Sequence, residues 1–118
     1  MTAPPGTGRE VVQDDAGRRE QRIVDVLMAL REGEVTTYGD VADVAGYPRH
    51  ARLVGRLLGT TDAEVPWWRV VNAAGRLVSG SPRLQTELLT SEGVIVRDER
   101  VVDAPLGRFS RRRSPSAP

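Results

Sequence analysis

The chain has 118 residues, of which 28% are charged and 4% aromatic, and this length suits one small domain with a modest core. It has no cysteine and one histidine, which excludes a disulfide, a thiol nucleophile and cysteine-ligated zinc, so we expect neither metal nor cofactor. No apolar run is long enough to span a membrane and residues 1–8 lack a signal sequence. We therefore expect a soluble cytoplasmic protein, nucleoid-associated if bacterial.

The net charge of +1 conceals a strong segregation of charge along the sequence. Residues 47–83 carry six arginines against two acidic residues, and residues 107–118 carry four arginines and no acidic residue. Each region therefore has a local charge of +4, while the rest of the chain is acidic. Clustered cations of this kind are typical of proteins that bind a polyanion such as a nucleic acid.

The first part of the chain predicts a leader followed by a helix. Residues 1–17 are rich in proline, glycine, threonine and aspartate, and we interpret them as a flexible leader. From Arg18 to Glu32, the apolar residues Ile23 and Leu27 recur with helical spacing, and Gly33 follows. This pattern predicts an amphipathic helix that covers a core.

Residues 37–59 predict two short helices joined by a tight turn. Thr37, with Asp40 three positions later, forms a variant capping box for the first helix. The second helix is expected over residues 50–59, and the pair is a candidate helix-turn-helix motif. The second helix would face DNA with its exposed basic residues, which are His50, Arg52 and Arg56.

Trp67 and Trp68 are adjacent in a chain that has few aromatic residues. Pro66 holds the residues before it extended, so we expect a rigid extended segment that continues into a short strand. Neighbouring side chains on an extended segment point to opposite faces. Either one ring is core and the other lies on the surface, or one ring lines a pocket for a flat ligand with Arg69 nearby for an anion.

The last third of the chain predicts a helix between two hairpins. Residues 75–80 would be the return strand of the first hairpin, residues 83–91 the helix, and residues 94–102 the second hairpin. From Pro105 the composition changes to arginine, serine and proline. We interpret residues 105–118 as a basic disordered tail.

Taken in order, these motifs resemble the DNA-binding domain of the O6-alkylguanine-DNA alkyltransferases. The resemblance covers about residues 18–102 and implies a mostly α fold with a small β component. This fold is the winged helix-turn-helix-like C-terminal domain of the alkyltransferases, here over residues 18–104. The motifs that carry the resemblance in combination are Thr37-Tyr38, Ala51-Arg52-Leu53-Val54-Gly55, Pro66-Trp67-Trp68-Arg69-Val70 and Glu92-Gly93.

One departure from this family bears on activity. The enzymes carry Pro-Cys-His-Arg-Val, and this chain has Trp67 and Trp68 in place of the acceptor cysteine and the histidine. Tryptophan cannot accept an alkyl group by thiolate displacement, so we expect no enzymatic activity. The chain is similar to the alkyltransferase-like proteins, which have Trp at the acceptor position but keep the histidine. Glu92 matches the glutamate that orients the histidine in the enzymes. Because this chain has Trp68 in place of that histidine, Glu92 would have no histidine to orient.

The resemblance implies a role for each matching residue. Arg52 would enter the duplex and fill the gap left by a flipped nucleotide, while Tyr38 would press on the neighbouring phosphate. Trp67 would line the pocket that receives the alkylated guanine, with Val78 and Ser79 as further members. The residues assigned to DNA or lesion binding are Tyr38, Arg52, Trp67, Trp68, Arg69, Val78 and Ser79, and those assigned to phosphate contacts are Thr37, Arg49, His50 and Arg56.

The implied function is non-enzymatic recognition of DNA damage. A monomer would bind double-stranded DNA containing O6-alkylguanine, flip the nucleotide and flag it for nucleotide excision repair proteins, with no membrane partner. The alternative is a helix-turn-helix transcription regulator that reads undamaged DNA. Residues 49–56 lack the asparagine or glutamine that reads adenine edges, which disfavours this alternative. Taken singly, Tyr38 and Arg52 are equally explained as a helix-start aromatic and a solvated charge.

Overall fold

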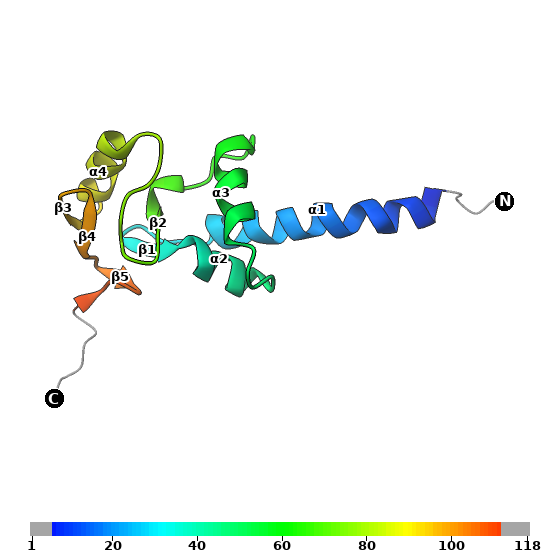
Figure 1. Cartoon of the computed structure of the whole chain (residues 1–118), viewed down its shortest axis with the longest axis horizontal. Helices are drawn as coiled ribbons and strands as arrows, with labels where there is room; N and C mark the ends of the chain where they lie inside the picture. The colour runs from blue at the N-terminus through cyan, green and yellow to red at the C-terminus, as the bar shows by residue number, and fades with distance from the viewer. Residues whose placement is uncertain (1–5, 112–118) are drawn as a thin grey trace, which may run out of the picture.

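The computed structural model describes the backbone of residues 6–111 and the side chains of residues 15–111. Within this part of the chain, short strands and one 3₁₀ turn connect four α-helices (Figure 1). The predicted mostly α fold with a small β component is confirmed. The elements are α1 (Gly6–Met28), β1 (Glu34–Thr37), α2 (Tyr38–Ala45), α3 (Ala51–Thr60), the 3₁₀ turn η1 (Trp67–Arg69), β2 (Val70–Val71), α4 (Pro82–Ser91), β3 (Ile95–Arg97), β4 (Arg100–Asp103) and β5 (Leu106–Gly107).

The strand β1 connects the two halves of the molecule. It lies in the middle of a three-stranded parallel sheet, with β2 on one side and β5 on the other. In Figure 1 the helices α2 and α3 pack around the C-terminal half of α1, while α4 and the β3–β4 hairpin gather at the other end. The antiparallel β3–β4 hairpin matches the terminal hairpin that the sequence predicts.

The hydrophobic core consists of two clusters, and β2 contributes one residue to each. Val70 belongs to the cluster that joins α1, α2 and α3, where Ile23 and Leu27 are fully buried. Val71 belongs to the cluster under α4 and the hairpin. Successive residues of a strand point to opposite faces, so a two-residue strand is enough to join both clusters. The turn η1, directly before β2, is thereby placed at the boundary between them.

The helix-turn-helix motif is formed as predicted by α2 and α3. The Thr37 hydroxyl accepts a hydrogen bond from the Asp40 backbone N–H at 3.0 Å, which caps the first turn of α2. Gly46 ends α2 with φ of +94°, a left-handed conformation that favours glycine. Arg49 has a positive φ of 74° in the turn before α3, so two left-handed residues set the angle between the helices.

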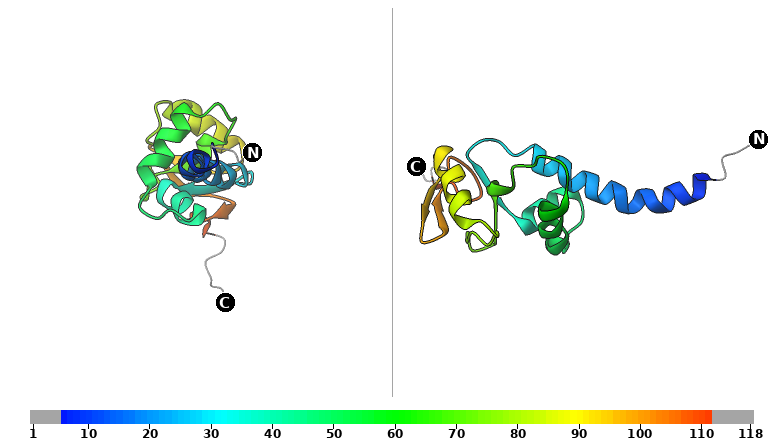
Figure 2. Two further views of the ribbon diagram at one scale, coloured as in Figure 1. Left: turned by 90° about the vertical axis from the view of Figure 1, so that its right-hand side faces the viewer. Right: turned by 90° about the horizontal axis from the view of Figure 1, so that it is seen from above.

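The first helix begins earlier than the sequence analysis predicts. It starts at Gly6 instead of Arg18, so residues 6–17 of the predicted flexible leader are helical. Figure 2 shows this part of α1 extending away from the rest of the molecule. A low apolar content means that a segment can bury little surface against the rest of the protein. It does not prevent a helix, because helical hydrogen bonds form within the segment itself. Residues 1–5 of the leader lie outside the described residues. No helix in the described part of the chain is long and apolar enough to cross a membrane.

Residues 105–111 of the predicted disordered tail are ordered, which corrects the tail boundary. Leu106 pairs with Glu34 through the β5–β1 ladder, and Arg108 forms an ion pair with Asp40 at 2.9 Å. Phe109 packs on the second core cluster. A free edge of β1 and an apolar ring are enough to hold a segment whose composition is otherwise polar. Residues 112–118 lie outside the described residues.

The predicted pairing of residues 75–80 with the strand before them is wrong. Leu77 donates its backbone N–H to Glu99 at 2.9 Å, and Arg76 bridges to Arg100, so this segment joins the β3–β4 hairpin. The Asn72 side chain closes the preceding turn by accepting from the backbone of Arg76 at 2.8 Å. Because β2 pairs with β1 instead, the following residues are free to pair with the hairpin.

Candidate nucleic-acid interface

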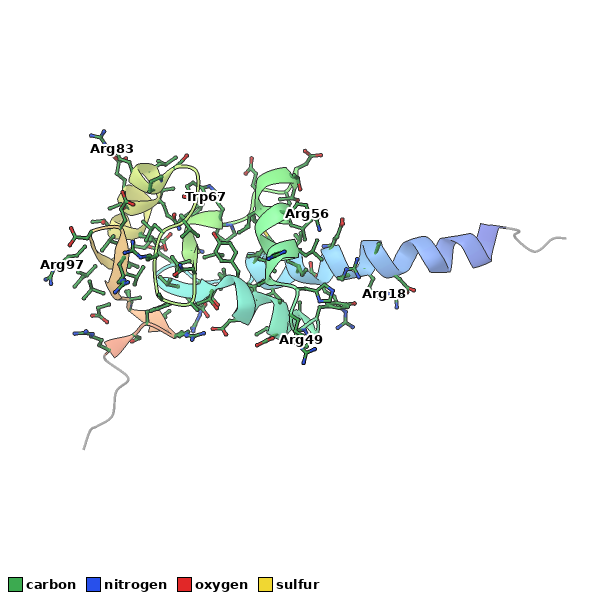
Figure 3. All side chains as sticks on the ribbon, viewed as in Figure 1. Arg18, Arg49, Arg56, Trp67, Arg83 and Arg97 are labelled. Carbon is green, nitrogen blue, oxygen red and sulfur yellow. The ribbon has the colours of Figure 1, made fainter. Side chains whose placement is uncertain are left out.

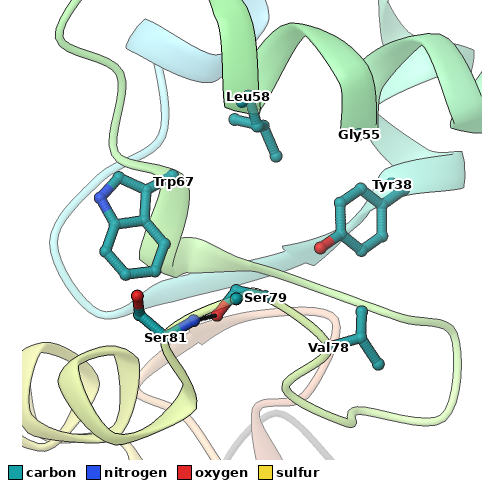
Figure 4. Close-up of a pocket in the computed structure, with 9 residues that line it drawn as sticks. Tyr38, Gly55, Leu58, Trp67, Val78, Ser79 and Ser81 are labelled. Atoms are coloured by element: carbon teal, nitrogen blue, oxygen red, sulfur yellow. Dashed lines mark hydrogen bonds between the residues drawn. The ribbon is translucent and has the colours of Figure 1, made fainter.

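A pocket of about 450 Å³ opens between α3, η1 and the loop before α4 (Figure 4). The structure brings together four of the residues predicted to bind a lesion, namely Tyr38, Trp67, Val78 and Ser79. Figure 4 shows Tyr38 and Trp67 on opposite sides of the pocket, with the loop residues below them. The sequence analysis did not assign the other lining residues, which are Gly55, Leu58, Gly59, Gly80 and Ser81.

Tyr38 is the first residue of α2, and its ring lies against Gly55 of α3. A Cβ atom added at Gly55 would lie 3.8 Å from the Tyr38 ring, in ordinary van der Waals contact, so α3 forms a close backing for the ring. Burial raises the pKa of the Tyr38 hydroxyl above its usual value. The hydroxyl therefore stays protonated at neutral pH and can donate a hydrogen bond.

The segment Trp67–Arg69 is a 3₁₀ turn, which corrects the predicted extended conformation. The Arg69 backbone N–H donates to Pro66 at 3.1 Å and closes this turn. A 3₁₀ helix has three residues per turn, so neighbouring side chains diverge by roughly 120° instead of 180°. The two indole rings meet edge to face, with centroids 6.0 Å apart and planes at 90°. Trp67 consequently lines the pocket, while Trp68 packs on the second core cluster.

Glu92, the residue after α4, organises the interior side of η1. Its carboxylate accepts from Trp68 Nε1 at 2.8 Å, from Arg69 Nη2 at 2.7 Å and from the Gly33 backbone at 2.8 Å. Glu92 has no histidine to orient, as the sequence analysis expects, and the indole N–H of Trp68 donates to its carboxylate instead. Burial alone would raise the pKa of Glu92, but the hydrogen bonds from Arg69, Gly33 and Trp68 and the Arg69 charge together hold it below its usual value.

Three residues assigned to DNA from sequence are used inside the protein instead. Arg69, with its side chain 14% exposed, pairs with Glu92, donates to Leu30 O at 2.9 Å and lies over the Trp68 ring. Neither Arg69 nor Trp68 lines the pocket, so their assignment to lesion binding is corrected. Thr37 is 2% exposed and caps α2, so it cannot reach a phosphate. A buried guanidinium needs a fixed partner, and here the partner is a carboxylate.

Arg52, predicted to enter the duplex, and the remaining predicted phosphate contacts lie on the helix-turn-helix motif, outside the pocket. Arg49, Arg52 and Arg56 are exposed, and Figure 3 shows Arg49 and Arg56 projecting outward from the turn and from α3. His50 is half-buried against Tyr47, with the two rings edge to face and 5.9 Å apart. The basic residues on α3 therefore lie on the same helix as the pocket residues Gly55, Leu58 and Gly59.

One further polar residue, missed in the sequence analysis, supports the pocket from behind. Gln85 of α4 is 0% exposed and hydrogen bonds to Ser79 and to the backbone around η1. The available signal was its spacing, because Gln85 lies four residues before the buried Leu89 on the same helix face. Within residues 15–111, no group of three or more His, Asp or Glu residues is arranged to hold a metal ion.

The chain is similar in sequence to proteins that act on DNA bases and to alkyltransferase-like proteins. A DNA base-flipping protein of Escherichia coli is 39% identical over 117 residues, spanning 90% of this chain and 88% of the relative. Alkyltransferase-like protein 1 of Schizosaccharomyces pombe is 34% identical over 79 residues, or 62% of this chain and 73% of the relative.

Solved structures show the same fold. An S. pombe alkyltransferase-like protein in complex with damaged DNA containing O6-carboxymethylguanine has a TM-score of 0.62 at 30% identity, covering 69% of this chain and 81% of that chain. Mycobacterium tuberculosis O6-methylguanine methyltransferase has a TM-score of 0.56 at 27% identity, covering 78% and 69%. Residues 18–94 match the family described as 6-O-methylguanine DNA methyltransferase, DNA binding domain. The chain belongs to this family, as a member without the acceptor cysteine.

Proposed function

We propose that this protein recognises O6-alkylguanine in double-stranded DNA, holds the flipped base in the pocket and leaves the alkyl group in place. The observation that carries the proposal is Trp67. It occupies the position of the acceptor cysteine, it lines the pocket, and the chain has no thiol anywhere. The pocket therefore has a wall on which a base can stack but no nucleophile that can take the alkyl group.

The dimensions and chemistry of the pocket suit a flat, neutral ligand with an apolar substituent. Its volume of about 450 Å³ is within the usual range for small-ligand sites. Its lining combines apolar side chains with the hydroxyls of Tyr38, Ser79 and Ser81. Stacking on one aromatic ring contributes about 1–3 kcal/mol, which is comparable to the few kcal/mol that extruding a nucleotide costs. A weakly paired alkylated base lowers this cost further.

The surface beside the pocket suits the DNA backbone. The exposed arginines on the turn and on α3 would contact phosphates, and Arg52 would occupy the space that the flipped nucleotide leaves. Gly59 and Gly80 both line the pocket, and a Cβ added at either position would meet no atom within 4 Å. A nucleotide entering between these two residues would meet no side chain from either of them.

A lesion that is bound but not repaired requires a second activity to remove it. We therefore propose that the complex is a signal for nucleotide excision repair proteins, which cut the strand instead of reversing the damage. A reconstituted excision assay tests this part of the proposal. Adding the protein should increase incision of a duplex with a single O6-alkylguanine and leave an undamaged duplex uncut.

The binding proposal is tested by competition between three duplexes of one sequence that carry guanine, O6-methylguanine or O6-benzylguanine. We expect both modified duplexes to bind more tightly than the intact one, with the benzyl adduct no weaker than the methyl adduct. Arg97→Ala is the control variant and should bind all three duplexes as the unmodified protein does. Arg97 is exposed on β3, at the far end of the molecule from α3 (Figure 3). Equal affinity for all three duplexes, or tighter binding to the intact duplex, would support the regulator hypothesis instead.

A further inference from the structure

Gln85 is a fully buried polar side chain that joins two walls of the pocket. Its Nε2 atom lies 3.1 Å from Trp68 O and 3.1 Å from Val70 O, the carbonyls that flank Arg69. Its Oε1 atom lies 2.8 Å from the Ser79 hydroxyl, in the loop before α4. One side chain of α4 therefore connects the segment that presents Trp67 to the loop on the other side of the pocket.

The partners of Gln85 determine the orientation of its amide. Backbone carbonyls can only accept hydrogen bonds, so the NH₂ group must face Trp68 O and Val70 O. The amide oxygen must then face Ser79, and the Ser79 hydroxyl has to be the donor. The Ser79 oxygen in turn accepts from the Ser81 backbone N–H at 3.2 Å. The chain of hydrogen bonds has a single direction, in which every amide atom of Gln85 has a partner.

The loop that carries Ser79 has few other attachments. Leu77 pairs with the hairpin before the loop and Gln85 N–H pairs with Ser81 O after it. Between them, Val78 and Gly80 are exposed. In the described part of the chain, the side-chain link from Ser79 to Gln85 is the only one that joins this loop to α4 and to η1. Gln85 therefore provides the side-chain hydrogen bonds between the Ser79 wall and the segment that carries Trp67.

We propose that Gln85 is a positioning residue for the lesion pocket: without contacting the flipped base, it sets the distance between the Trp67 and Ser79 walls. This inference rests on the proposed function, because it assigns a role within the same pocket. Truncating either end of the link should loosen the pocket and lower the preference for damaged DNA, while the phosphate contacts made by α3 stay intact. The two ends should act as one unit, since both serve the same connection.

The test compares the unmodified protein with Gln85→Met, Ser79→Ala and the double variant, using duplexes with guanine or O6-methylguanine. We expect each single variant to lower the ratio of damaged to intact affinity by about three- to tenfold, the range for the one hydrogen bond between Ser79 and Gln85 that both variants remove. Affinity for the intact duplex should not change, and the double variant should be no worse than the weaker single variant. Val94→Ala controls for stability, because Val94 is buried in the second core cluster and does not line the pocket.

Each outcome decides the inference. A lesion preference that persists in Ser79→Ala, or losses that multiply in the double variant, would overturn the positioning role while leaving the proposed function intact. A similar loss of lesion preference in Val94→Ala would also overturn it, by showing that stability alone controls binding. If Gln85→Met does not fold, Ser79→Ala still offers the overturning result, because the positioning role requires the lesion preference to fall when the Ser79 end of the link is removed. An unmodified protein without lesion preference would overturn both proposals.

Discussion

Replacing Glu92 by glutamine tests the buried ion pair that supports η1. The side chains of Arg69 and Glu92 are 14% and 8% exposed, so little water can replace the lost charge. Glutamine keeps the shape of the side chain but turns one acceptor into an NH₂ group that faces the donors of Trp68 and Arg69. Removing one partner of a buried pair costs about 3–5 kcal/mol. Because glutamine keeps one acceptor oxygen, we expect a loss near the lower end, about 3 kcal/mol.

Urea denaturation at pH 7 measures this loss, and thermal unfolding gives an independent measure. For a domain of this size, about 3 kcal/mol corresponds to a decrease in Tm of roughly 12–24 °C. The matched control is Glu87→Gln on the exposed face of α4, which should change the free energy of unfolding by less than about 0.5 kcal/mol.

The difference between the two proteins should also depend on pH. The pKa of Glu92 in the folded protein is held below the ordinary glutamate value of 4.5, so its ionised form stabilises the fold above that value. This stabilisation is lost as the pH falls through the folded-state pKa, whereas the glutamine variant does not titrate. The stability difference should therefore shrink between pH 7 and pH 3. A difference of less than about 0.5 kcal/mol at pH 7, or one that is constant with pH, would refute the ion-pair argument.

Three further predictions concern the pocket and the DNA surface. Trp67→Ala should weaken binding to the damaged duplex by about 1–3 kcal/mol with little change in Tm. Trp68→Ala should instead lower the free energy of unfolding by about 3 kcal/mol. If Trp67→Ala loses stability and Trp68→Ala loses lesion binding, the assignment of the two rings is reversed. Arg52→Ala should weaken binding to the damaged duplex more than Arg56→Ala on the same helix, as measured by titration, and equal losses would mean that Arg52 does not enter the duplex. Incubation with O6-[³H]methylguanine DNA should leave the label on the DNA, and stoichiometric label on the protein would contradict the absence of an acceptor.

Features that depend on short stretches of chain could be predicted from the sequence. The Thr37 cap on α2, the end of this helix at Gly46 and the β3–β4 hairpin all form as expected. Each depends on hydrogen bonds or backbone preferences within a few residues. The lack of transferase chemistry is equally local, because it follows from the absence of cysteine and from Trp67 at the acceptor position.

Two features that depend on distant contacts were predicted incorrectly. Residues 105–111 appeared disordered because their composition is polar, yet pairing with β1 holds them in place. The segment around Trp67 appeared extended because proline precedes it, whereas the packing of Trp68 on the second core cluster accompanies a 3₁₀ turn. Composition and propensity describe a segment alone and contain no information about the surface it meets.

The sequence by itself determined that this protein has a helix-turn-helix motif, a basic region and no group that can accept an alkyl group. Only the tertiary structure decided which charged and polar residues are exposed on the helix-turn-helix motif and which support the pocket. Arg69 looks like a ligand for an anion in the sequence, but folding places it against Glu92, 23 residues away. The same carboxylate accepts from Gly33, 59 residues away, so its role exists only after three segments have met. Residue chemistry is a local property, whereas the partner of a buried charge is a property of the assembled fold.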